Sequence, residues 1–178
     1  MIKFLISLFL VATLSSADEM GTKGGSCILS QDGAVNVSWK AYKTPSKVGV
    51  SGVFDNTKYT AIAPKGNNFR EIFVGSSIII DTTSVNSKNS GRDVKLVKFF
   101  FEQMSSQNIT AKIIDIKSDK RVRGKPKTGV MSVSVTMNGI TRTVPMSYIF
   151  NKGDLQATGN IDLFDFSASK ALNSINKA

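Results

Sequence analysis

The residue types that most often carry catalysis are scarce in this chain. Its 178 residues include no histidine and one cysteine, Cys27. Such a chain has no His-based triad or His-containing metal site, and one cysteine makes neither an internal disulfide nor a Cys-rich metal cluster. Asp162 and Asp165 are close together, but acidic residues near a helix start usually cap it. We therefore expect no enzyme activity, no metal and no cofactor. A lysine-activated serine is the one remaining route, and no pair of residues marks it.

The adjacent residues Arg92 and Asp93 are the polar pair best suited to holding a ligand. A guanidinium group is a planar set of donors that fits a carbonyl, an amide or a phosphate, and Asp93 could orient it. The alternative is a structural ion pair that ties the start of a helix to the rest of the fold. The sequence leaves both readings open.

Basic residues are concentrated in one short segment. The formal net charge is +10, and six basic residues fall between positions 117 and 127, where Gly124 and Pro126 predict a loop between strands. This loop is either a solvated hairpin tip or a site of transient contact with an anionic membrane surface. Nucleic acid is not an expected partner, because no aromatic residues are interleaved with the charges. The six residues are Lys117, Lys120, Arg121, Arg123, Lys125 and Lys127.

Residues 1–17 have the pattern of a secretory signal peptide. Lys3 precedes an apolar run over residues 4–14, and small residues follow at 15–17. The run is too short to span a bilayer as a permanent helix. We expect residues 18–178 to form one exported domain, in which Cys27 is buried or paired with another molecule.

The elements that must position these side chains are mainly strands. Residues 129–150 alternate apolar and polar residues on both sides of Asn138-Gly139, which predicts a β-hairpin with a tight type I′ turn. Shorter alternating runs precede and follow it. A helix with an apolar stripe is expected from Ser90, and a second amphipathic helix at the end of the chain. The first stripe comprises Val94, Val97, Phe101 and Met104, with Leu96 and Phe100 beside it, and the second comprises Ala168, Ala171, Leu172 and Ile175.

About eight antiparallel strands in sequence order predict an up-and-down barrel. At that size the lumen is either filled by side chains or wide enough for one slender ligand. Many of the expected inward residues are small or are methionines, which adapt to irregular apolar shapes. An exported barrel with an apolar lumen favours a lipid-like guest, and a barrel filled solid is the alternative.

Several segments, in order, resemble the YceI-like family of bacterial polyisoprenoid-binding proteins. They match the family's v-x-G-x-F, R-D-x-x-L…F-F and G-v-T-[RK]-x-V patterns, together with the strand before the helix and an acidic, phenylalanine-containing stretch near the end. The segments are residues 50–54, 92–100, 139–144, 79–85 and 162–166. The resemblance implies a lipocalin-like barrel around a long-chain amphiphile, in the periplasm or secreted. The family often has a histidine after Arg-Asp, where this chain has Lys95.

These observations predict an exported, non-enzymatic carrier for a polyisoprenoid, a quinone tail or a fatty-acid derivative. The alternative is a ligand-free interaction protein that presents its basic outer face to an anionic membrane or partner. Whether two barrels form a homodimer is left open. The candidate ligand-binding residues are Trp39, Val48, Val50, Phe54, Arg92, Asp93, Phe99, Phe100, Ile113, Val135, Met137, Met146, Tyr148 and Phe150.

Overall fold

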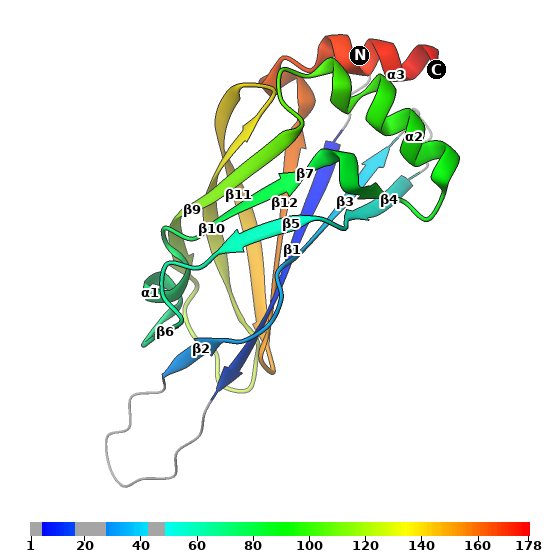
Figure 1. Ribbon diagram of the computed structural model, residues 1–178. Coiled ribbons are helices and arrows are strands. Elements are labelled where there is room, and N and C mark those ends of the chain that lie inside the picture. Colours follow the sequence, from blue (N-terminus) through cyan, green and yellow to red (C-terminus); the bar gives the residue numbers. More distant parts are fainter. Residues whose placement is uncertain (1–4, 17–27, 43–48) are drawn as a thin grey trace, which may run out of the picture.

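The protein folds as a curled antiparallel sheet with helices at both ends (Figure 1). The computed structural model describes residues 5–16, 28–42 and 49–178, with the backbone alone for residues 5–16. Cys27 and Val48 lie outside the described residues. The strands are β1 (Leu5–Ser16), β2 (Leu29–Gln31), β3 (Asn36–Tyr42), β4 (Gly49–Phe54), β5 (Thr57–Thr60), β6 (Lys65–Gly66), β7 (Ser77–Asp81), β8 (Val85–Asn86), β9 (Asn108–Ser118), β10 (Lys127–Met137), β11 (Ile140–Asn151) and β12 (Asp154–Asp162). The helices are α1 (Phe69–Phe73), α2 (Ser90–Phe99) and α3 (Ser169–Lys177).

The prediction of a mainly β, antiparallel fold is confirmed, but the count of eight strands is wrong. The described chain has twelve strands, in the order β5-β7-β9-β10-β11-β12-β1-β3-β4-β8, with β2 and β6 beside this path. The predicted strand over residues 77–85 is two strands, because Asp81 caps a turn of 3₁₀ helix at Thr82–Ser84. This break lets β7 pair with β5 and β9 while β8 pairs with β4.

The two ends of the sheet, β5 and β8, meet at one corner. The backbone N–H of Asp55 donates to the carbonyl oxygen of Ser84 at 3.0 Å, and that of Asn56 donates to Ser84 Oγ at 2.9 Å. The Asp81 carboxylate accepts hydrogen bonds from Thr83 and Asn56, and the Thr83 hydroxyl is the main reason that the pKa of Asp81 is lowered. The sheet therefore curls on itself without a continuous ladder of hydrogen bonds around it.

The predicted hairpin is present as β10 and β11. Asn138 and Gly139 have φ angles of 53° and 74°, as a type I′ turn requires, and Met137 pairs directly with Ile140. The predicted inward residues of both strands are buried, apart from the half-buried Phe150. Strands β9 to β12 form an up-and-down series, so successive turns lie at opposite ends of the sheet.

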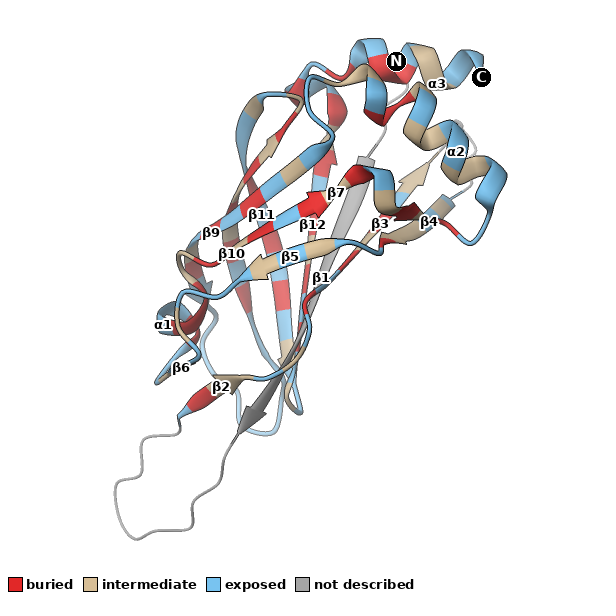
Figure 2. Ribbon diagram, in the orientation of Figure 1, coloured by how far each residue is buried: buried red, intermediate tan, exposed pale blue. Residues whose placement is uncertain are grey.

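Buried residues lie along the strands in the middle of the curled sheet (Figure 2), and their side chains form one hydrophobic cluster. The side chains of Met131, Val135, Met146 and Leu155 are each 2% exposed or less. In the middle of the sheet the lumen is therefore filled by side chains, as in the alternative to an open barrel. Unfilled space lies towards the two ends.

Helices α2 and α3 lie where the sequence predicts them, but not every residue of the predicted apolar faces is buried. Asn89, not Ser90, caps α2, because its side chain accepts a hydrogen bond from the backbone of Arg92 at 2.9 Å. Val94 is 64% exposed, so the predicted stripe does not hold there. The helix ends at Phe99, and a turn of 3₁₀ helix over residues 101–103 changes the phase of the pattern. The predicted apolar face of α3 is confirmed, with three buried residues and the half-buried Ile175.

Strand β1 includes most of the predicted signal peptide. Its backbone pairs with β12 on one side and with β3 on the other, so it joins the two parts of the sheet. The signal peptide stays a prediction. No helix within the described residues is both long and apolar enough to cross a membrane.

Candidate functional site

An apolar cavity lies between the curled sheet and helices α2 and α3. Its volume is about 290 Å³, at the lower edge of the roughly 300–1,000 Å³ common for small-molecule sites. We call this part of the molecule the cavity end; it comprises the cavity and helices α2 and α3, which Figure 1 shows together at one end of the sheet. The side chains that line it are Trp39, Ala41, Val50, Phe54, Arg92, Lys95, Leu96, Phe100, Phe101, Ile109, Met137, Ile161, Leu163, Leu172, Ile175 and Asn176, and Ala178 completes the wall.

Strands β3 and β4 supply the wall around Trp39. Val37 and Trp39 are buried because alternate residues of β3 face inwards. Trp39 pairs across the strands with Gly52, whose missing side chain leaves room for the indole ring. A Cβ atom at Gly52 would come within 2.9 Å of Trp39 Cζ2 and 2.6 Å of the Asn86 carbonyl oxygen. The glycine of the v-x-G-x-F segment thus has a direct packing role.

The indole N–H of Trp39 is an exception in an otherwise satisfied interior. Trp39 is 6% exposed, and its Nε1 atom is the one buried side-chain nitrogen or oxygen in the described residues without a hydrogen-bond partner. Leaving a buried donor unpaired costs about 1–3 kcal/mol. Trp39 lines the cavity, but its Nε1 atom is itself inaccessible.

Two cationic side chains, Arg92 and Lys95, line the cavity from α2. Lys95 Nζ donates to the carbonyl oxygen of Ala178 at 2.8 Å, which links α2 to the end of α3. Asp93 does not line the cavity. Its carboxylate accepts hydrogen bonds from the Ser87 backbone N–H at 2.9 Å and from the Ser87 hydroxyl at 2.6 Å.

The predicted pairing of Arg92 with Asp93 is not observed. Within the described residues the one ion pair joins Arg70 to Asp115. The bonds from Ser87 instead fix Asp93 at the first turn of α2. Arg92 is left available at the cavity wall. Asp93 has a structural role, but through Ser87 and not through the ion pair with Arg92 that was the alternative.

The structure describes thirteen of the fourteen predicted ligand-binding residues, all but Val48, and brings six of them together at the cavity. Those that line the cavity are Trp39, Val50, Phe54, Arg92, Phe100 and Met137. Ile113, Val135 and Met146 are buried but do not line it. Tyr148 and Phe150 contact Phe69 of α1, and Phe99 lies outside the cavity, where its ring is 5.4 Å from Lys98 Nζ.

Sequence reasoning missed the contribution of α3 to the site. Leu172 and Ile175 line the cavity, as do Ile161 and Leu163 at the end of β12. The apolar stripe of α3 was visible in the sequence. The position of α3 over the lumen could not be seen in the sequence, because it depends on where β12 ends relative to β3.

The opposite end of the sheet, which we call the α1 end, is packed and cationic. It comprises α1, β2, β6 and the basic loop at residues 119–126 (Figure 1). The Phe69 ring lies 5.7 Å from that of Tyr148 and 5.1 Å from that of Phe150, and Lys127 Nζ lies 5.2 Å from the Phe69 centroid. A surface hollow of about 450 Å³ lies between α1 and the basic loop.

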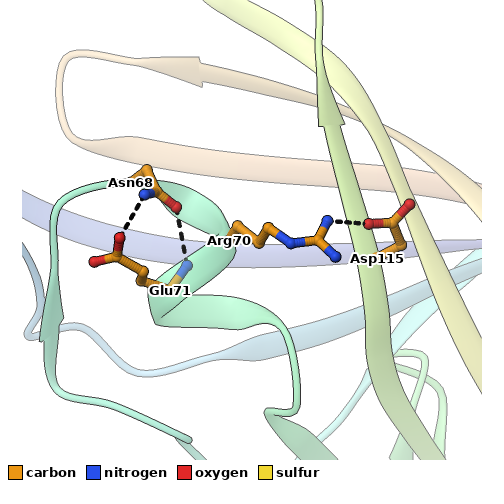
Figure 3. A network of polar contacts seen from close by, with 4 residues as sticks. All are labelled: Asn68, Arg70, Glu71 and Asp115. Carbon is orange, nitrogen blue, oxygen red and sulfur yellow. Dashed lines mark hydrogen bonds and ion pairs between the residues drawn. The ribbon is translucent and has the colours of Figure 1, made fainter.

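Helix α1 is fixed to the sheet by polar contacts (Figure 3). The Asn68 side chain accepts from the Glu71 backbone at 3.0 Å and donates to the Glu71 carboxylate at 2.7 Å. Arg70 reaches across to Asp115 of β9, and its hydrogen bond lowers the pKa of that carboxyl. These contacts hold Phe69 over the end of the lumen.

The basic loop is far from the cavity. Lys127 and Met137 lie ten residues apart at the two ends of β10, which is roughly 33 Å at about 3.3 Å per residue. All residues from 117 to 128 are exposed. Contact between this loop and a membrane stays a prediction, and such contact would not by itself bring the cavity to the membrane.

No cluster of three or more cysteine, aspartate or glutamate side chains that could hold a metal ion occurs in the described ranges. The groups that line the cavity offer apolar contact, the side-chain amide of Asn176 and two cations. Such a set of groups can bind and orient a ligand.

The comparisons with known proteins give a family match. The model of the YceI-like domain matches residues 30–178, which is more than half of the chain. A search of curated proteins finds no match.

A search of solved structures finds distant similarities. One is a polyisoprenoid binding domain from Saccharophagus degradans implicated in plant cell wall breakdown, with 12% identity over 98% of this chain and 85% of that chain and a TM-score of 0.48. Another is a mutant CJ YCEI protein for nanotechnology applications, with 18% identity over 70% of this chain and 73% of that chain and a TM-score of 0.48. Because these likenesses are distant, the site is assigned from this chain's own residues.

Proposed function

Because the chain belongs to the YceI-like family, we propose that it binds a long-chain, mainly apolar amphiphile in the cavity beneath α2 and α3. The guest would be a polyisoprenoid, a quinone with its tail, or a fatty-acid derivative. The protein would act as a non-enzymatic carrier outside the cytoplasm. The observation that carries the proposal is an apolar cavity left between a packed sheet and two helices.

The driving force for binding would be the removal of apolar ligand surface from water. This contributes roughly 25 cal/mol for each Å² of apolar surface that is buried. Cavities lined by leucine, isoleucine and phenylalanine stay dry and accept apolar guests. The side chains of Leu96, Phe100, Ile161 and Leu172 make this kind of wall.

The length of the guest is limited by the packed middle of the sheet. A cavity of about 290 Å³ holds one segment of a long chain rather than its whole length. Met131 and Met146 lie in the packed middle, and methionine side chains change rotamer readily. A longer guest would extend along the lumen as these two side chains move aside.

The polar end of an amphiphile has partners at the same site. Arg92 lines the cavity without an ion-pair partner among the described residues. Its guanidinium group can donate several hydrogen bonds to a carbonyl or a phosphate. This favours a guest that enters tail first and leaves its head near α2.

Filling the cavity tests the proposal. Ala41 lines the cavity from β3, and Ala41→Phe would occupy part of the space. We expect native mass spectrometry of the exported protein to show a co-purifying lipid, and we expect Ala41→Phe to reduce its occupancy at least tenfold. Thr110→Phe, on the exposed side of β9, is the matched control. If lipid is absent from the unsubstituted protein even after incubation with isoprenoid, quinone and fatty-acid mixtures, the proposal fails.

The alternative function, contact with an anionic surface, has its own supporting observation. The basic loop is exposed throughout and borders the hollow beside α1. Because this region and the cavity are at opposite ends of the sheet, the two activities can be tested separately. Loss of vesicle binding with intact lipid uptake would assign the loop a surface role in addition to the carrier role.

A further inference from the structure

The α1 end gathers positive charge from two segments that are separate in the sequence. Beside the larger hollow, of about 450 Å³, lies a smaller one of about 180 Å³, and Arg121, Lys125 and Lys127 line both. Lys152, in the turn between β11 and β12, lines the smaller hollow. The cationic surface therefore extends from the basic loop to a neighbouring hairpin.

The protein supplies these cations with little negative charge of its own. None of them forms an ion pair within the described residues, where the one ion pair joins Arg70 to Asp115. Asp119 is the one acidic residue that lines the larger hollow, and its carboxylate accepts a hydrogen bond from the Thr128 hydroxyl at 2.6 Å. The smaller hollow is lined by no acidic residue. An anionic ligand would therefore be attracted to this surface.

The larger hollow also exposes aliphatic side chains next to the cations. Val122 is 55% exposed and Ile149 is 53% exposed, and both line it. Val122 begins a turn of the basic loop, where its carbonyl oxygen accepts a hydrogen bond from the Lys125 backbone N–H at 3.2 Å. Exposed aliphatic groups among lysine and arginine side chains are typical of surfaces that bind anionic lipids.

The combination of groups favours a lipid over other anions. A soluble phosphate would contact the cations but leave Val122 and Ile149 in water. A nucleic acid would need exposed rings for its bases to stack on, whereas Phe69 is buried and Phe150 is half-buried. An anionic lipid has a charged part for the cations and an apolar part for the aliphatic side chains.

We propose that the larger hollow binds one anionic phospholipid of a membrane, with its phosphate near Arg121 and Lys125 and the start of an acyl chain against Val122 and Ile149. Lys152 contacts the head group of a neighbouring lipid. The proposal rests on the alternative function, contact with an anionic surface, and adds to it a lipid site and a second hairpin. The cavity end then points away from the membrane, because it lies at the opposite end of the sheet.

The first test asks which end of the protein meets the acyl chains. A tryptophan is introduced at the α1 end by Val122→Trp or, as the matched control, at the exposed valine of α2 by Val94→Trp, with Trp39 kept in both variants. The vesicles contain phosphatidylglycerol and a phosphatidylcholine with brominated acyl chains, which quench tryptophan fluorescence on contact. We expect strong quenching in Val122→Trp and none beyond that of the unsubstituted protein in Val94→Trp.

The second test removes the aliphatic contact without changing the charge. The double variant Val122→Ser with Ile149→Ser should bind the phosphatidylglycerol vesicles about tenfold more weakly, because two half-exposed aliphatic side chains no longer contact lipid. The control is Val94→Ser with Ile79→Ser, which removes two exposed aliphatic side chains that line neither hollow. It should leave vesicle binding unchanged.

The third test concerns the second hairpin. Lys152→Gln should weaken binding to the same vesicles by about fivefold, as expected for one charge near a membrane surface. Lys170→Gln makes the same charge change on α3, at the cavity end, and should have no effect. Equal effects of the two variants would contradict a contact made by Lys152.

The outcomes separate this proposal from the function on which it rests. If the vesicles bind but neither tryptophan is quenched and the serine variants bind alike, the lipid site is overturned and contact through charge alone stands. If Val94→Trp is the quenched variant, the cavity end meets the membrane and the proposal fails. Displacement from vesicles by soluble glycerol phosphate or by polyglutamate, without quenching, would assign the surface to a soluble anion or an acidic protein instead. If no vesicles bind, both the site and the alternative function are overturned, and the carrier role is unaffected.

Discussion

Trp39 and Tyr148 make the clearest comparison between the two ends of the sheet. Each is a buried aromatic residue with one polar atom, and each pairs across strands with a glycine, Gly52 for Trp39 and Gly129 for Tyr148. The Tyr148 hydroxyl is 2.6 Å from Ser118 Oγ, whereas Trp39 Nε1 has no partner in the described chain. The polar atom of the buried aromatic residue therefore has a hydrogen-bond partner at the α1 end and lacks one at the cavity end.

The difference shows that packing and binding are assigned to separate parts of one interior. At the α1 end, aromatic rings fill the space and the positive charge lies on the outside. At the cavity end, apolar space remains under two helices. Substitutions at the first end should change stability or surface contacts, and substitutions at the second should change ligand binding.

The largest effect is expected for substitutions in the basic loop, which should weaken binding to anionic membranes. Changing Lys120, Arg121, Arg123 and Lys125 to glutamine should weaken binding to anionic vesicles by at least about a hundredfold, at about 1 kcal/mol for each charge near the surface. Lipid uptake should not change. Vesicle sedimentation at several salt concentrations measures vesicle binding, and native mass spectrometry measures lipid uptake.

A matched control keeps the charge change but moves it to the cavity end. It replaces the exposed residues Lys88, Lys98, Lys170 and Lys177 by glutamine. Equal loss of vesicle binding in both variants would show that net charge, not the loop, is responsible. Loss of lipid uptake in the loop variant would contradict the separation of the two ends.

Gly129→Ala should cause the largest loss of stability. A Cβ atom there would overlap the carbonyl oxygen of Lys117 and come within 2.7 Å of Tyr148 Cε1, so the backbone of β9 must move. We expect the free energy of unfolding to fall by about 3 kcal/mol, the upper part of the range for overpacking. Urea unfolding measures it, with Gly91→Ala at an open helical position as the control. If Gly129→Ala lowers the free energy of unfolding no more than Gly91→Ala does, the packing described at the α1 end is contradicted.

Gly52→Ala should affect both the fold and the cavity. The new Cβ atom would come within 2.6 Å of the Asn86 carbonyl oxygen and 2.9 Å of Trp39 Cζ2, so the backbone at β8 and the Trp39 ring must both move, and we expect a stability loss of about 2 kcal/mol. Because Trp39 lines the cavity, affinity for the lipid should fall as well. Calorimetry measures the ligand affinity, and urea unfolding measures the free energy of unfolding. If ligand affinity is unchanged, Trp39 does not contribute to binding.

The smallest expected effect depends on pH at Tyr148. Burial raises the pKa of the Tyr148 hydroxyl, and Asp119 adds to the rise while the bond to Ser118 opposes it. The neutral form is therefore favoured in the fold, and this stability is present below about pH 10, the usual tyrosine pKa, and is lost as pH rises through the folded pKa.

Comparison with Tyr148→Phe isolates this contribution. The variant should be less stable by about 1 kcal/mol at pH 7, because the hydrogen bond with Ser118 is lost. The difference should narrow above about pH 10, where only the tyrosine can ionise. Urea unfolding between neutral pH and pH 11 measures it, and a constant difference would contradict the proposed effect of burial.

Local patterns predicted the hairpin well, because the information lies within a few residues. The Asn138-Gly139 turn fixes its own conformation, and the alternation on either side fixes which residues are buried. The face of α3 could be predicted for the same reason. Val94 was misassigned because the helical period was continued past Phe99, where the helix ends.

Features that depend on distant partners could not be predicted. The pairing of β8 with β4 and the corner at Asn56 involve residues far apart in the sequence. Whether a lumen is filled depends on the fit between side chains, so Met146 and Met137 looked alike in the sequence but only Met137 lines the cavity. The position of the basic loop was predictable, since turns alternate between the ends of an up-and-down series.

Helix α2 covers the cavity although none of its own residues is fully buried. It is held at its start by Asp93 and Ser87, and just beyond its end by the buried Phe100 and Phe101. The Lys95 bond to Ala178 and the half-buried Leu96 and Val97 hold it in between, but a helix without a fully buried residue can separate from the sheet at a lower free-energy cost than unfolding of the whole domain. The residence time of a guest would then be set by how often this helix opens, so two guests of equal affinity could load and unload at very different speeds.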